Sequence, residues 1–307
     1  MVHNGIEYGD MQLIAEVYDV LKSIIGMSNE EMSKTFAKWN DGILESYLIE
    51  ITSKILAKPD DITGEGYVVD YVLDQTGSKG TGRWTVQEAA EQSVAAPTLA
   101  AALDSRYISS RKEERLKASA LLNGPTDIPN VSKFQLIEDL EAALYAAKIC
   151  SYAQGLGIIK AASAAKNWDV DMSQCAKMWK GGCIIRAKLL DKIQGALKTN
   201  PNLPNLMVDL TFAAELNERQ LAWRRIVTLC VASGISCPAL SASLNYYDSY
   251  RRESLPANLT QAQRDFFGGH TYERVDREGP FHCAWTDAHK GIGDISERTA
   301  GENASRL

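Results

Sequence analysis

Apolar residues recur along this chain with helical spacing almost from end to end. Between Asp10 and Ile25 there is no Pro or Gly, and apolar side chains at every third or fourth position form a stripe, while others fill much of the remaining circumference. A helix of this kind is buried on more than one side. Because strand-like alternation is nearly absent, the predicted fold class is all-α, with long helices around one core. Further helical runs are predicted at residues 43–56, 99–122, 133–166, 172–199 and 206–232.

Capping signals predict where several helices start. Ser28 followed by Glu31 has the spacing of a capping box, in which the hydroxyl and the carboxylate each accept a free backbone N–H. Thr85 followed by Glu88 predicts a second box, and Pro97 then interrupts or restarts the helix that it opens.

Two segments depart from the helical pattern. Residues 74–84, "DQTGSKGTGRW", crowd glycines around Lys79 and are predicted to be a loop. After residue 251 the chain mixes Pro, Gly, aromatic and charged residues, and an exposed tail would not need so many aromatics. We therefore predict two parts: a helical domain over residues 1–253, and an extended tail over residues 254–307 that packs against something, such as a second copy of the chain.

Composition limits the possible partners. The 307 residues are 45% hydrophobic and 23% charged, as in ordinary globular proteins, and a net charge of −6 argues against general nucleic-acid binding. No apolar stretch approaches the roughly 20 residues of a membrane span, so a cytoplasmic protein with no membrane partner is expected. The six cysteines form no CxxC pair or metal-spaced cluster and are expected to be reduced thiols, with no metal site.

The first residues carry the most reactive set of side chains. His3, Asn4, Glu7 and Tyr8 form two i, i+4 pairs, so one helix face holds a base, an amide, a carboxylic acid and a phenol. The alternative is a solvated first turn, which is the better expectation for an arbitrary N-terminus. The apolar helix that follows favours the functional interpretation, because it would anchor this face rigidly.

The segment "GSKGTGRW" could bind an anion. Clustered glycines let backbone N–H groups approach a phosphate, and Lys79 adds a point charge, although the spacing is not that of a Walker A loop. A plain Gly-rich turn with one solvated lysine is an equally good interpretation. Arg106 and Arg264 could complete a dianion site with Lys79, but lone arginines are more often surface ion pairs.

Two further interpretations concern histidines and a cysteine. Isolated histidines such as His270 and His282 are more often structural than catalytic. The segment "WKGGCIIR", residues 179–186, could be a helix whose glycines allow close packing. Cys183 is predicted to be a buried packing residue, not a nucleophile.

Four stretches together resemble a known family: "HNGIEYGDMQ", "DQTGSKGTGRW", "WKGGCIIR" and "QAQRDFFGGHTYE". In this order and approximate spacing they are similar to 6-phosphogluconate dehydrogenase, the decarboxylating NADP enzyme of the pentose phosphate pathway. The resemblance covers nearly the whole chain. It implies an all-helical substrate-binding and dimerisation domain, followed by a tail that reaches into the partner subunit of a homodimer and helps complete its active site.

The resemblance also assigns residue roles. Glu7 matches the general acid that protonates the enediol left after carbon dioxide departs. His3 and Asn4 resemble residues that hold the sugar-acid end of 6-phosphogluconate. The implied ligands of the substrate phosphate are Tyr8, Lys79, Thr81, Arg106 and, from the partner's tail, Arg264. His270 resembles a substrate-binding residue of the tail that reaches across with Arg264.

One departure from the family pattern limits the expected activity. Family members carry a βαβ domain with a Gly-rich NADP fingerprint before this region, as well as a general-base lysine, and neither occurs in this sequence. The chain alone is therefore expected to be inactive, while the full enzyme would oxidise 6-phosphogluconate at C3 and decarboxylate the keto acid to ribulose 5-phosphate. The alternative is an inactive truncated paralogue that acts as a dimeric scaffold or a phosphosugar-binding module.

Overall fold

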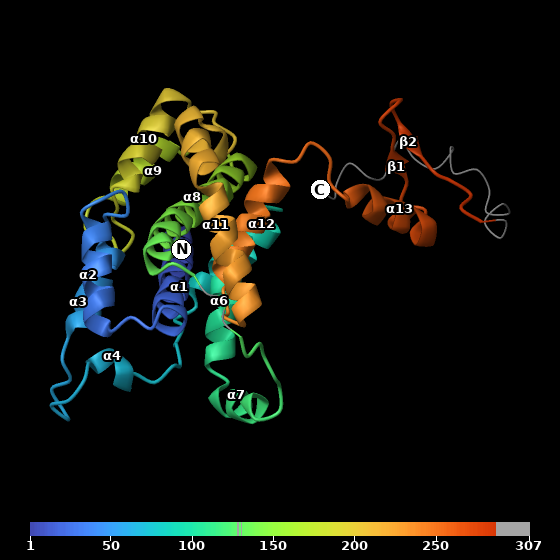
Figure 1. The fold of residues 1–307 in the computed structure, drawn as a ribbon. Helices are drawn as coiled ribbons and strands as arrows, with labels where there is room; N and C mark the ends of the chain where they lie inside the picture. The colour runs from blue at the N-terminus through green and yellow to red at the C-terminus, as the bar shows by residue number, and fades with distance from the viewer. Residues whose placement is uncertain (128, 130, 287–307) are drawn as a thin grey trace. The chain divides into compact units, whose positions relative to one another are not determined.

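The computed structural model describes residues 1–127, 129 and 131–286, which group into two compact units, Met1–Asp248 and a second that starts at Ser249. The first unit is built of helices (Figure 1). The helices are α1 (Val2–Asp19), the π-helix η1 (Val20–Ile24), α2 (Asn29–Asn40), α3 (Tyr47–Ala57), α4 (Val68–Tyr71), α5 (Thr81–Glu91), α6 (Pro97–Ser109), α7 (Lys112–Ser119), α8 (Lys133–Ala165), α9 (Met172–Met178), α10 (Leu189–Thr199), the 3-10 helix η2 (Leu206–Val208), α11 (Leu210–Ser233) and α12 (Pro238–Tyr250), which ends just past the boundary.

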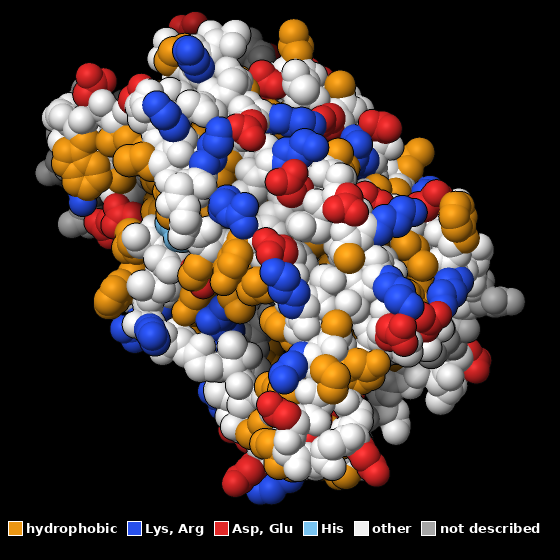
Figure 2. Space-filling view, turned by 90° about the vertical axis from the view of Figure 1, so that its left-hand side faces the viewer, with side chains coloured by type: hydrophobic (Ala, Val, Ile, Leu, Met, Phe, Trp, Pro, Cys, Tyr) orange, Lys and Arg blue, Asp and Glu red, His pale blue; other side chains and the backbone are white. Residues whose placement is uncertain are grey.

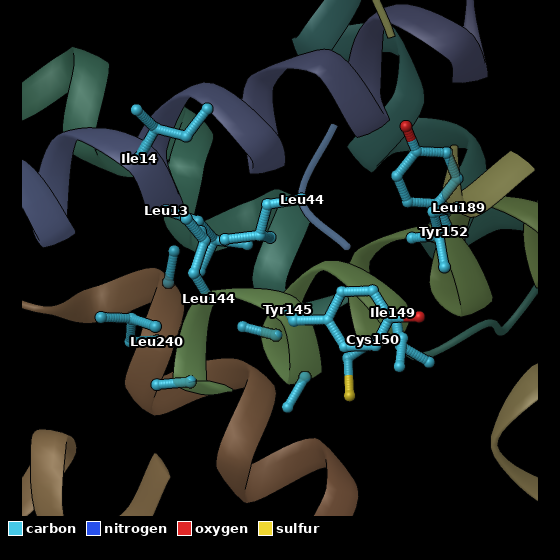
Figure 3. Packing of buried hydrophobic residues seen from close by; sticks show 14 of the residues in the cluster. Leu13, Ile14, Leu44, Leu144, Tyr145, Ile149, Cys150, Tyr152, Leu189 and Leu240 are labelled. Atoms are coloured by element: carbon cyan, nitrogen blue, oxygen red, sulfur yellow. The ribbon is translucent and has the colours of Figure 1, made fainter. Parts of the chain in front are cut away.

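The long helix α8 forms the centre of the first unit, with α1 on one side and α11 on another (Figure 1). Leu13 of α1, Leu144 of α8 and Leu240 of α12 lie together in the core, with Ile149 farther along α8, and all four are fully buried (Figure 3). Burial of each such side chain contributes about 1.5–3 kcal/mol. The all-α prediction is confirmed, and α1 is buried on several sides, as its pattern indicates.

Two buried carboxylates hold α1 against its neighbours. Asp10 accepts a hydrogen bond from Lys148 of α8 over 2.6 Å, and both side chains are almost inaccessible to solvent. Burial raises the pKa of Asp10, against the opposing charge of Lys148. Farther along the helix, Glu16 accepts the backbone N–H groups of Ala239 and Leu240, each over 2.8 Å. These polar contacts fix the depth and the rotation of the helix that carries His3 to Tyr8.

One predicted capping box is confirmed and the other is wrong. Ser28 and Glu31 exchange both expected hydrogen bonds at the start of α2. Helix α5, however, begins at Thr81, directly after Gly80 with φ at 97°, so the predicted loop ends at residue 80. Thr85 lies inside α5, where its hydroxyl donates to the carbonyls of Thr81 and Met1.

Three of the predicted helical runs are each divided in two, among them residues 206–232, which form η2 and α11. Residues 133–166 are confirmed as α8 within one residue, while the run at 43–56 becomes helical only from residue 47, in α3. Residues 99–122 contain most of α6 and all of α7, and Pro97 is the first residue of α6. Residues 172–199 form α9 and α10. The segment 179–186 between them is not helical, because Gly182 adopts a φ of 75° that a helix cannot contain. Cys183 in this segment is only half-buried, so the prediction that it is a buried packing residue is wrong.

The second unit contains α13 (Ala257–Gly268) and a short antiparallel pair, β1 (Tyr272–Glu273) and β2 (Pro280–Phe281). These are the only strands in the described part of the chain. Tyr272 faces Phe281 across the pair, with ring centroids 6.4 Å apart, so some of the tail's aromatics pack within it. The division into residues 1–253 and 254–307 stays a prediction, because residues 287–307 lie outside the described part.

The surface mixes both signs of charge. On the face in Figure 2, Lys and Arg side chains are interleaved with Asp and Glu, so neither sign dominates it. Among the described helices, none is long and apolar enough to cross a membrane. Within the same residues, no group of three or more His, Cys, Asp and Glu side chains could hold a metal ion.

Candidate functional site

Tyr8 and Arg106 form the centre of the site, where α1 meets α6. The Arg106 guanidinium lies over the Tyr8 ring, 3.4 Å from its centroid, and the ring is buried at 5% exposure. Arg106 also donates to the carbonyl of Gly77 over 3.3 Å, and the Tyr8 hydroxyl lies 3.2 Å from Oγ of Ser78. The Gly-rich loop is thus tied to both helices.

Close packing at Gly82 sets the position of the Tyr8 ring. A Cβ atom at residue 82 would lie 2.5 Å from Cδ2 of Tyr8, so only glycine lets the ring rest on the first turn of α5. Tyr8 packs here with Ala102 and Leu103 of α6. The ring is therefore held between two helices, while its hydroxyl points to the loop.

Lys79 and Thr81 lie on the same loop and at the start of α5. The Lys79 side chain is exposed and makes no hydrogen bond or ion pair to any described residue, so its ammonium group is available to a ligand. Thr81 is the first residue of α5, where backbone N–H groups lack helical partners. The structure therefore brings Lys79, Thr81, Tyr8 and Arg106 to one region, and this cluster has the chemistry of an anion site.

Asn4 and Glu7 continue the site along α1. The Asn4 amide donates to Glu7 Oε2 over 3.0 Å, which orients the carboxyl group. Burial lowers the pKa of Arg106, while Tyr8 and Glu7 act in the opposite direction. Because the charge of Glu7 raises the pKa of Arg106, the carboxyl group lies close enough to the guanidinium to interact with it electrostatically.

His3 lies at the N-terminal end of the same face. Its ring is half-buried and packs edge-on against Trp179, with centroids 6.1 Å apart. Burial lowers the pKa of His3, which favours the neutral imidazole. Its buried Nε2 atom has no hydrogen-bond partner among the described residues, which leaves that nitrogen free to bind a ligand.

Arg264 and His270 belong to the second unit. Arg264 donates to Oε1 of Gln261 over 3.0 Å, and the His270 ring packs edge-on against Phe267. His282 pairs with Asp265 over 2.9 Å, in the structural role predicted for it.

Some contacting residues were not among the predicted site residues. Gly77, Ser78 and Gly82 hold the Arg106 and Tyr8 side chains in place. The only sequence signal for them was their position in the Gly-rich stretch around Lys79. Their partners lie far away in the sequence, so that signal could not pair them.

Comparison with known proteins places these features in a family. A family model described as 6-phosphogluconate dehydrogenase, C-terminal domain, matches residues 1–285. The chain belongs to this family. It is similar to 6-phosphogluconate dehydrogenase, decarboxylating 1, of Spinacia oleracea, with 59% identity over 93% of this chain and 60% of the relative. A chloroplastic decarboxylating relative from Arabidopsis thaliana is 57% identical, again over 93% of this chain and 60% of that protein.

A solved structure supports the same assignment. The 6-phosphogluconate dehydrogenase of Plasmodium falciparum matches with a TM-score of 0.90 and 49% identity, over 93% of this chain and 61% of that one. That protein was solved in its apo form, with its cofactor NADP+ and with its substrate 6-phosphogluconate. The chain spans about 60% of the length of the curated relatives it matches.

Proposed function

We propose that this chain is the substrate-binding and dimerisation part of a decarboxylating 6-phosphogluconate dehydrogenase. The full enzyme oxidises 6-phosphogluconate with NADP and releases carbon dioxide and ribulose 5-phosphate. Family membership and the substrate named for the Plasmodium falciparum relative support this proposal. The observation that carries it is the Arg106 guanidinium, which stacks on Tyr8 and donates to the Gly-rich loop that presents the exposed Lys79.

The proposed roles follow the arrangement of charges along α1. The phosphate binds among Lys79, Thr81, Arg106 and the Tyr8 hydroxyl, because charge-assisted hydrogen bonds are the strong ones for a dianion. The sugar-acid end lies toward His3 and Asn4. Glu7, held by Asn4, protonates the enediol after decarboxylation, which is a general-acid step by a carboxyl within reach of the substrate.

NADP does not fit the described residues. A dinucleotide-binding unit needs parallel strands with a Gly-rich turn at a helix N-terminus. In the described part of the chain the strands are β1 and β2, two residues each and antiparallel. We therefore assign no NADP ligand and no step of the hydride transfer to these residues.

A homodimer with exchanged tails is part of the proposal. An apolar groove of about 560 Å³ lies between the start of α8 and α11, and the exposed Leu221 of α11 lines it. A second copy of the chain would cover such apolar surface. In the exchanged arrangement, Arg264 and His270 serve the partner's phosphate site. The cytoplasmic location stays a prediction, since relatives include chloroplastic proteins.

Calorimetric titration with 6-phosphogluconate tests the phosphate site. Replacing Arg106 by alanine removes one charge-assisted contact, so affinity should fall about 10- to 100-fold. Arg106→Lys keeps the charge but loses the planar stack on Tyr8, so an intermediate loss is expected. Unchanged affinity in Arg106→Ala would contradict the proposal and favour the scaffold alternative.

Mixed dimers test the exchange of tails. Differently tagged Arg106→Ala and Arg264→Ala chains are co-expressed, and the heterodimer is purified. With exchanged tails, one site carries both defects and the other carries none, so each heterodimer keeps one tight site. If Arg264 serves its own subunit, both sites are defective and no tight site remains.

A further inference from the structure

Asp265 is a carboxylate of the second unit that contacts several segments of the chain. It lies near the end of α13 and is fully buried. Oδ1 accepts the Thr271 N–H and lies 2.9 Å from Nδ1 of His282, while Oδ2 accepts the Cys283 N–H over 3.2 Å and the Trp285 indole N–H over 2.8 Å. One carboxylate thus joins α13 to the segments on both sides of the β1–β2 pair.

The loop that carries His270 is closed at both ends by Asp265. The Gly269 N–H donates to the Asp265 carbonyl over 2.9 Å, and the Thr271 N–H donates to its carboxylate, also over 2.9 Å. The His270 ring lies over Gly268, where a Cβ atom would approach Cδ2 of the ring to 2.7 Å. The backbone on both sides of His270 is therefore held by the Asp265 contacts.

Gln261 connects Arg264 to the same loop. Its Oε1 accepts from Arg264 over 3.0 Å, and its Nε2 donates to the Thr271 carbonyl over 2.6 Å. Thr271 is also the residue that Asp265 holds. Consequently the guanidinium of Arg264 and the backbone next to His270 are linked through one side chain.

We propose that Asp265 is a positioning residue that fixes Arg264 and His270 in one preformed phosphate-binding element. This inference rests on the proposed function, in which both residues bind the substrate phosphate. Ordering the two side chains before binding removes an entropic cost of about 0.5–1.5 kcal/mol for each immobilised side chain. Asp265 itself does not contact the substrate and acts only through Arg264 and His270.

The test is calorimetric titration of the whole 307-residue chain with 6-phosphogluconate. Asp265→Asn keeps the shape but presents an amide N–H₂ to groups that are themselves donors, so affinity should fall about tenfold. In Arg264→Ala the affinity for 6-phosphogluconate should fall about 10- to 100-fold. The matched control is Asp276→Asn, which changes an exposed hairpin carboxylate paired with Arg274 and should bind like the original chain.

A second comparison separates positioning from a general structural role. In an Arg264→Ala/His270→Ala background, adding Asp265→Asn should cause no further loss, because the groups through which it acts are gone. An equal tenfold loss in that background would overturn the proposal. If Asp265→Asn does not fold, Trp285→Phe removes one donor only and should give a smaller loss.

The outcomes distinguish this inference from the proposed function. If Arg264→Ala weakens binding while Asp265→Asn and Trp285→Phe do not, positioning by Asp265 is refuted and the proposed function stands. If Arg264→Ala binds 6-phosphogluconate like the original chain, the proposed role of Arg264 in phosphate binding is refuted, and the inference about Asp265 is refuted with it.

Discussion

Glu16 should make the stability of this chain depend on pH in an unusual direction. The side chain is 2% exposed and accepts the first N–H groups of α12, with a further hydrogen bond from Gln12. Burial raises the pKa of Glu16 from 4.5 to about 7, although the hydrogen bonds from Leu240, Ala239 and Gln12 act against the increase. Folding therefore binds a proton at this position between these pH values.

The sign and size of the effect follow from that difference. Because the pKa is higher in the folded chain than in the unfolded chain, the stabilisation is fully present below pH 4.5 and is lost as the pH rises to about 7. At about 1.4 kcal/mol for each pH unit, the gap corresponds to roughly 3 kcal/mol. Carboxylates whose pKa is lowered by a neighbouring cation, such as Asp74 beside Arg115 and Lys112, act in the opposite direction, so the effect has to be isolated by substitution.

Glu16→Gln imitates the protonated form and does not titrate. Urea unfolding at several pH values between 4.5 and 8 should show the variant gaining roughly 3 kcal/mol relative to the original chain as the pH rises. Glu30→Gln, at an exposed carboxylate paired with Lys34, serves as the control and should show a small, nearly constant difference. A constant difference for Glu16→Gln as well would refute the argument, since Glu16 would then titrate as in the unfolded chain.

The fold was largely predictable because it depends on local periodicity. A 33-residue helix such as α8 is specified by its own sequence, as is the Ser28 capping box. The failures occur where tertiary contacts decide. Thr85 has the spacing of a cap, yet its hydroxyl bonds to the Met1 carbonyl, which only the packing of α1 on α5 brings near. The break at Gly182 depends on a backbone conformation that a period of 3.6 does not report.

The site was predictable in its parts but not in its geometry. The helical spacing placed Asn4 and Glu7, three residues apart, on one face, and their hydrogen bond lies within a single helix. The stacking of Arg106 on Tyr8 depends on how α1 and α6 pack, so the sequence gives the two residue types without the contact. Arg264 was a candidate by its charge alone, because no local pattern links it to the other cations, and only the resemblance implied that it acts in the partner's site.

Three further substitutions test these contacts. Gly82→Ala introduces a Cβ against the Tyr8 ring, which must move, so calorimetry should show 6-phosphogluconate affinity reduced about tenfold, at an overpacking cost of about 1–3 kcal/mol; unchanged affinity would mean that the ring position does not matter. Ser28→Ala removes a helix cap and should lower the free energy of unfolding in urea by about 1 kcal/mol. Lys148→Met leaves the Asp10 carboxylate buried without its cation, and unfolding should show a loss of about 3–5 kcal/mol. Because the damage lies in the unpaired charge, adding Asp10→Asn to Lys148→Met should restore much of that stability. A double variant as unstable as the single one would show that the lysine matters for its packing and not for the pair.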